Sequence, residues 1–153
     1  MIDLLKVING DYEEGKRLAE CLRKNYSSKG DAKHFYYITL KSFCMEMFIK
    51  EQCDWLEFNN DYCHYYFIER YIDPYFKEFY EPDFIAKDTK EFWELKGFLI
   101  KDNPTTNLHG AKNVIEFDKE KNVFYFNGKD EMLFTGYWKE VYEEIREIEK
   151  NDY

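Results

Sequence analysis

The feature that most constrains the fold is a concentration of aromatic side chains in residues 54–84. This segment holds twelve of the chain's 31 Phe, Tyr and Trp residues, together with eight acidic and two basic side chains. Disordered segments lack aromatic residues, because they cannot bury enough apolar surface to offset the entropy lost on folding. We therefore expect the segment to belong to a packed domain.

Apolar residues in this segment recur at three- and four-residue steps, which is the spacing of one face of an α-helix. The stripe comprises Phe58, Tyr62, Tyr65, Ile68, Ile72, Tyr75 and Phe79. Asp73 and Pro74 interrupt it, because proline disrupts a helix interior but suits the first helical position. We expect a long kinked aromatic helix, or two helices in series, that ends at Pro82.

Helices are also predicted at both ends of the chain. Residues 9–26 and 31–53 carry apolar residues at helical spacing, and a short turn separates them. They predict an antiparallel αα-hairpin. Residues 135–150 predict a C-terminal amphipathic helix, with an apolar stripe on one side and glutamates on the other.

Between these helices the sequence predicts a small antiparallel sheet. Residues 113–127 form a β-hairpin pattern, and 132–134 can add a third strand. Residues 88–101 fit a short helix through Phe92 and Leu95, followed by a strand at 98–100. Because the helices precede and follow the strands rather than alternate with them, the predicted fold class is α+β, in one domain over residues 1–153.

The charge of the chain limits its partners. The formal net charge is −9, and no cluster of Lys and Arg provides the basic stripe that nucleic acid or an anionic membrane requires. We therefore expect no direct binding to either. Residues 1–8 lack the uninterrupted apolar run of a signal peptide, so we expect a soluble cytoplasmic protein.

No pattern of catalytic or metal-binding residues stands out. The cysteines are too far apart for a structural zinc site and are expected to be buried thiols: Cys21, Cys44, Cys53 and Cys63. No glycine-rich loop opens a helix, so no nucleotide cofactor is expected. His109 lies in a polar loop beside Gly110 and is the best isolated candidate for a polar site, although a surface histidine in a turn is the simpler explanation.

The segment 54–84 also predicts a binding surface. Tyr and Trp are favoured anchors in protein interfaces, and acids around them attract a basic partner and speed its association. We expect a non-enzymatic protein that blocks a basic protein partner, as bacterial immunity proteins block nuclease-type toxins. The predicted partner-binding residues are Trp55, Asp61, Tyr62, Tyr66, Glu69, Tyr71 and Asp73.

Other interpretations fit the same sequence. The tyrosines of residues 54–84 can instead lie in the core with their hydroxyls hydrogen-bonded. A phage-encoded inhibitor of a host defence protein would share the same charge and size. A small enzyme would need His109, His64 and a cysteine or carboxylate to converge, and a subunit of a larger assembly would use the aromatic face as a permanent interface.

Overall fold

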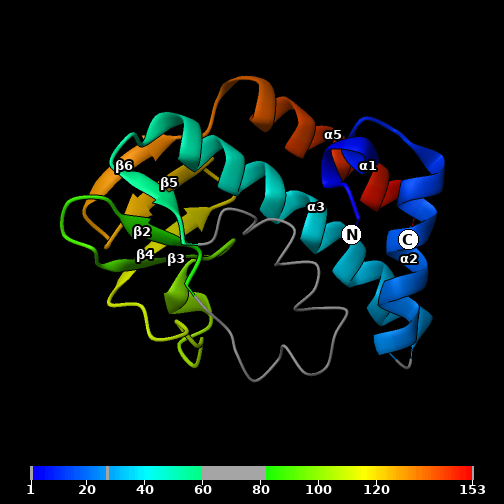
Figure 1. Ribbon diagram of the computed structural model, residues 1–153, viewed down its shortest axis with the longest axis horizontal. Helices are drawn as coiled ribbons and strands as arrows, with labels where there is room; N and C mark the ends of the chain where they lie inside the picture. The colour runs from blue at the N-terminus through cyan, green and yellow to red at the C-terminus, as the bar shows by residue number, and fades with distance from the viewer. Residues whose placement is uncertain (1, 27, 60–81, 153) are drawn as a thin grey trace. The chain divides into compact units, whose positions relative to one another are not determined.

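The computed structural model describes residues 2–26, 28–59 and 82–152, and confirms the α+β class (Figure 1). The α-helices of the described residues are α1 (Leu4–Ile8), α2 (Tyr12–Asn25), α3 (Lys29–Gln52) and α5 (Gly136–Asp152). The strands are β1 (Leu56–Phe58), β2 (Phe84–Ala86), β3 (Phe92–Leu95), β4 (Asn113–Asp118), β5 (Val123–Phe126) and β6 (Asp130–Leu133). Among these residues, no helix has both the length and the apolar character that crossing a lipid bilayer requires.

The chain divides into two compact units, and the boundary falls within α3. The described part of the first unit is residues 2–26, 28–45 and 137–152, and that of the second is 46–59 and 82–136. The single domain expected from the chain length stays a prediction.

In the first unit, acidic side chains fix the starts of the short N-terminal helices. Asp3 accepts a hydrogen bond from the Leu5 amide at 3.1 Å at the start of α1, and Asp11 accepts one from the Glu14 amide at 3.1 Å at the start of α2. Such caps satisfy backbone donors that have no partner within the helix. The Glu14 carboxylate also accepts the Asp3 amide at 3.0 Å, which joins the two helices.

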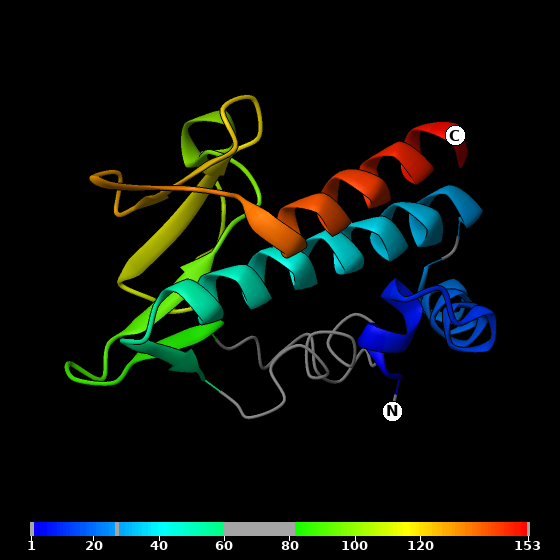
Figure 2. The same cartoon turned by 90° about the horizontal axis from the view of Figure 1, so that it is seen from above.

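Helix α5 lies alongside the part of α3 that belongs to the first unit (Figure 2). Phe43 of α3 packs edge-on against Trp138 of α5, with ring centroids 5.6 Å apart. Nearer the C-terminus, Lys41 pairs with Glu149 at 3.0 Å. The predicted C-terminal amphipathic helix is therefore confirmed, and its apolar stripe faces α3.

Helices α2 and α3 form close to their predicted positions, but they do not run side by side. Figure 2 shows α2 almost end-on while α3 extends across the view, so the two helices cross steeply. The expected antiparallel arrangement is wrong, because α5 takes the place beside α3 that an antiparallel α2 would occupy. Tyr26, at the end of α2, stacks on Phe35 of α3 at 4.2 Å and holds the corner between the helices.

The second unit contains a six-stranded sheet in the order β1-β2-β3-β4-β5-β6. Neighbouring strands are antiparallel except β3 and β4, which are parallel. The predicted hairpin of residues 113–127 and its third strand are confirmed as β4, β5 and β6. The sheet is larger than the three strands expected, because three short strands precede them.

Three local predictions near the sheet are wrong. Phe92–Leu95 is strand β3 rather than a helix, and residues 98–100 lead into a 3-10 turn, Ile100–Asp102. Leu56–Phe58 is strand β1, although Phe58 was expected to begin the aromatic helix. β1 and β3 become strands because β2 supplies hydrogen-bond partners to both and β4 supplies them to β3. The remainder of that helix, 60–79, lies outside the described residues.

The sheet has one apolar face, which forms the core of the second unit. Ile115, Phe117 and Phe124 on this face are fully buried. Phe48, from the end of α3, stacks on Phe124 with centroids 5.9 Å apart and meets Phe134 edge-on at 4.9 Å. Because successive residues of a strand point to opposite faces, this packing also decides which residues occupy the other face.

Candidate functional site

The face of the sheet opposite this core is acidic. The strand residues that alternate with the core residues are Glu57, Ile85, Phe92, Glu94, Val114, Glu116, Asp118, Val123, Tyr125, Glu131 and Leu133. Five of these residues are acidic and none is Lys or Arg. We call this set the acidic face.

The exposed end of the acidic face lies on β4, β5 and β6. Tyr125 pairs across the strands with Glu116 on one side and Glu131 on the other. Directly opposite side chains start about 5 Å apart, so the tyrosine ring lies between two carboxylates. Leu133 is 56% exposed beside them and Glu131 is also exposed. Acidic, aromatic and aliphatic side chains therefore occur together here.

The loop that connects β3 to β4 fixes one carboxylate of this end. The amide of Ile100, which begins the 3-10 turn, donates to Glu116 at 3.2 Å. Phe98 also accepts a hydrogen bond from the Phe117 amide, which ties the loop to β4. The loop thus holds Glu116 in place, whereas the exposed Glu131 on the edge strand β6 is open to a partner.

Two buried acids of the sheet region are part of the framework. Asp83 is buried and accepts the Leu95 amide at 2.9 Å, so it joins the start of β2 to β3. Glu94, at the centre of the acidic face, is also buried. These two carboxylates are not available to a partner.

The excess of negative charge lies mainly in the second unit. Its described residues contain fourteen acids and nine bases, whereas those of the first unit contain twelve acids and eleven bases. The second unit therefore attracts a basic partner more strongly. This attraction acts over the Debye length of about 10 Å.

Of the predicted partner-binding residues, only Trp55 is described. Its ring is 42% exposed and meets Trp93 edge-on at 5.2 Å and Phe126 at 6.1 Å. Trp93 and Phe126 belong to the core face of the sheet, so the structure does not bring Trp55 together with the acidic face. The other six lie outside the described residues: Asp61, Tyr62, Tyr66, Glu69, Tyr71 and Asp73.

The acidic face was not predicted from the sequence as a site. The acids Glu116 and Asp118 of Asn113–Asp118 are a signal that could have been found, because a period-two pattern places them on one side of a strand. The missing information was the pairing of β4 and β6 with β5.

The histidine and cysteine candidates for chemistry are dispersed. The amide of His109 donates to the Asn107 side chain at 2.8 Å in a tight turn where His109 has a φ of 52°. Burial raises the pKa of the Cys44 thiol to about 12 and that of Cys53 to about 11, which keeps both protonated and weakly nucleophilic at neutral pH. His64 and Cys63 lie outside the described residues. Within the described part of the chain, no three His, Cys, Asp or Glu side chains are placed to hold a metal ion.

Comparisons with models of protein families, with curated proteins and with solved structures find no match to this chain.

Proposed function

We propose that the protein is a cytoplasmic, non-enzymatic binding protein that blocks a basic protein partner, as an immunity protein against a nuclease-type bacterial toxin. The observation that carries this proposal is the acidic face, which has four carboxylates that are not buried and no Lys or Arg at its strand positions. Nucleases bind the phosphates of their substrates through Lys and Arg. A protein that presents carboxylates on a rigid sheet offers such a surface the same sign of charge as its substrate.

The mixture of side chains at the exposed end of the face supports binding rather than solubility alone. Carboxylates steer a basic partner and raise its association rate, whereas buried aromatic and aliphatic contacts slow its dissociation. Tyr125 lies between Glu116 and Glu131, and Leu133 is exposed beside them. Trp55 lies against the core face of the sheet, so it does not contribute to this surface.

A co-expression experiment tests the proposal in cells. The partner to test is the product of an adjacent gene, expressed at a level that stops growth. We expect the wild-type protein to restore growth, Glu131→Lys to restore it poorly, and Glu20→Lys to act as wild type. Glu20 is exposed on α2 and supplies the same change of charge in the first unit.

Three outcomes would contradict the proposal. The wild-type protein could fail to restore growth, the two variants could restore it equally poorly, or both variants could restore it fully. A phage-encoded inhibitor of a basic host defence protein would use the same chemistry. The identity of the partner that the wild-type protein neutralises distinguishes the two.

A further inference from the structure

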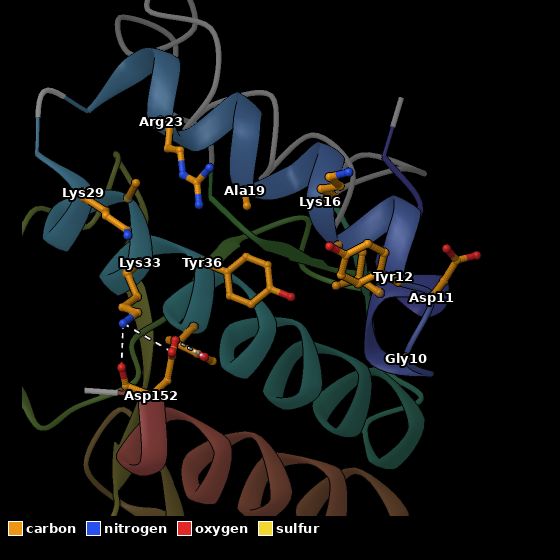
Figure 3. A pocket seen from close by; sticks show the side chains of 14 residues that line it. Gly10, Asp11, Tyr12, Lys16, Ala19, Arg23, Lys29, Lys33, Tyr36 and Asp152 are labelled. Carbon is orange, nitrogen blue, oxygen red and sulfur yellow. Dashed lines mark hydrogen bonds and ion pairs between the residues drawn. The ribbon is translucent and has the colours of Figure 1, made fainter.

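The first unit contains a pocket with a charge opposite to that of the chain as a whole. Residues of α2, α3 and the end of α5 line it, and its cavity volume is about 420 Å³ (Figure 3). Four of its lining residues are basic and two are acidic: Lys16, Arg23, Lys29 and Lys33 against Asp11 and Asp152. A volume of this size is within the range of pockets that bind small molecules.

The basic side chains are distributed unevenly around the pocket. Arg23 of α2 lies at one end with Lys29 and Lys33 of α3, whereas Lys16 lies at the other end near Tyr12 (Figure 3). Three cations from two helices therefore gather at one end. Because like charges repel, such a cluster is most stable when an anion lies among them.

Part of this charge is already neutralised within the unit. Lys33 donates to the backbone oxygen of Asp152 at 2.6 Å and lies 3.3 Å from its carboxylate, which also accepts the hydroxyl of Tyr37 at 2.6 Å. Arg23, in contrast, is exposed and has no hydrogen bond or ion pair among the residues that the structure describes. Lys29 is also exposed, although its charge acts on the Asp152 carboxylate, so Arg23 is the cation most available to a ligand.

The middle of the pocket suits the uncharged part of a ligand. The half-buried ring of Tyr36 projects into it with the hydroxyl directed towards Tyr12 (Figure 3), and Ala19 and Ala32 contribute apolar walls. Gly15 faces this ring, because a Cβ atom there would lie 3.4 Å from the Tyr36 oxygen. The glycine therefore leaves space around the phenol. The hydroxyl of Tyr36 is a donor at neutral pH, and burial raises its pKa further above the ordinary value of 10.0.

We propose that this pocket binds a phosphorylated small molecule of about the size of a mononucleotide. Arg23 and Lys29 hold the phosphate, since arginine donates two parallel hydrogen bonds to phosphate oxygens and lysine adds a point charge. Tyr36 and the alanine walls contact the ring of the ligand. This site is in the first unit, so it is separate from the acidic face and does not depend on the function proposed for that face.

Calorimetric titration of the full chain tests the pocket with four probes: adenosine monophosphate, ribose 5-phosphate, inorganic phosphate and adenosine. We expect saturable one-to-one binding of the first, competition by inorganic phosphate, and adenosine at least about tenfold weaker, because it lacks the phosphate. Arg23→Gln should weaken binding of adenosine monophosphate by roughly tenfold or more.

The matched control is Lys24→Gln, which removes the same charge from the next residue of α2, exposed and outside the pocket lining. It should leave the affinity within about twofold of wild type. Failure of all three phosphorylated probes to bind saturably would overturn the proposal. Equal weakening by the two variants would overturn it as well, since only the overall charge would then matter.

Discussion

At the scale of single residues, burial determines which titratable groups are reactive. Cys44 is fully buried in the first unit, and burial raises the pKa of its thiol to about 12. The sequence alone predicted buried thiols from the apolar helical patterns around the cysteines, and this is confirmed for Cys44 and Cys53, whereas Cys21 is only partly buried. It did not predict the pocket around Arg23, because Lys and Arg on amphipathic helices usually point to solvent.

Cys44 should make the protein less stable in alkaline solution. The unfolded thiol ionises near its ordinary pKa of 9.0, whereas the folded thiol stays protonated until about pH 12. The contribution of the protonated thiol to the free energy of unfolding is therefore fully present below pH 9 and is lost as the pH rises towards 12. The slope for one proton is at most about 1.4 kcal/mol per pH unit.

Urea unfolding at pH 8, 9 and 10 measures this effect. We expect the free energy of unfolding of the wild type to fall faster with pH than that of Cys44→Ala. Parallel pH profiles for the two proteins would show that the thiol is not protected from ionisation. The free energies of unfolding of the two proteins would then differ by a constant amount, which reflects only the loss of the sulfur atom.

At the scale of secondary-structure elements, long periodic segments were predicted well and short ones were not. The helical spacing of residues 31–53 is sufficient to specify α3, and the alternating pattern of 113–127 specifies β4 and β5. Phe92–Leu95 carries only four residues, so the pattern cannot separate helix from strand, and pairing with β2 and β4 decides it. The parallel pairing of β3 and β4 depends on the connection of residues 96–112, which has no regular pattern.

The assignment of the two sheet faces predicts a large loss of stability at a core position and a small one at an exposed position of the acidic face. Phe117→Ala removes a ring from the core face and should lower the free energy of unfolding by about 3–5 kcal/mol. Leu133→Ala, on the exposed end of the acidic face, should change it by less than about 1 kcal/mol. Chemical denaturation of the two variants gives both values. Similar losses would mean that the two faces of the sheet are assigned incorrectly.

At the scale of the whole molecule, the net charge of −9 does not describe either unit well. The described residues of the second unit carry most of the excess acid, and those of the first are nearly balanced and hold a basic pocket. The composition correctly drew attention to acidic charge, but the average concealed a site of opposite sign. The two proposed sites would therefore bind ligands of opposite charge.

The measurement that tests the central claim most directly is the affinity of the purified protein for the basic partner identified by growth rescue, at several salt concentrations. We expect Glu131→Lys to raise the Kd roughly tenfold at low salt, mainly through slower association, and the difference to shrink as salt screens the charge. Glu20→Lys changes the net charge equally and should leave the Kd within about twofold. Equal affinities for the two variants at every salt concentration would contradict a binding role for the acidic face.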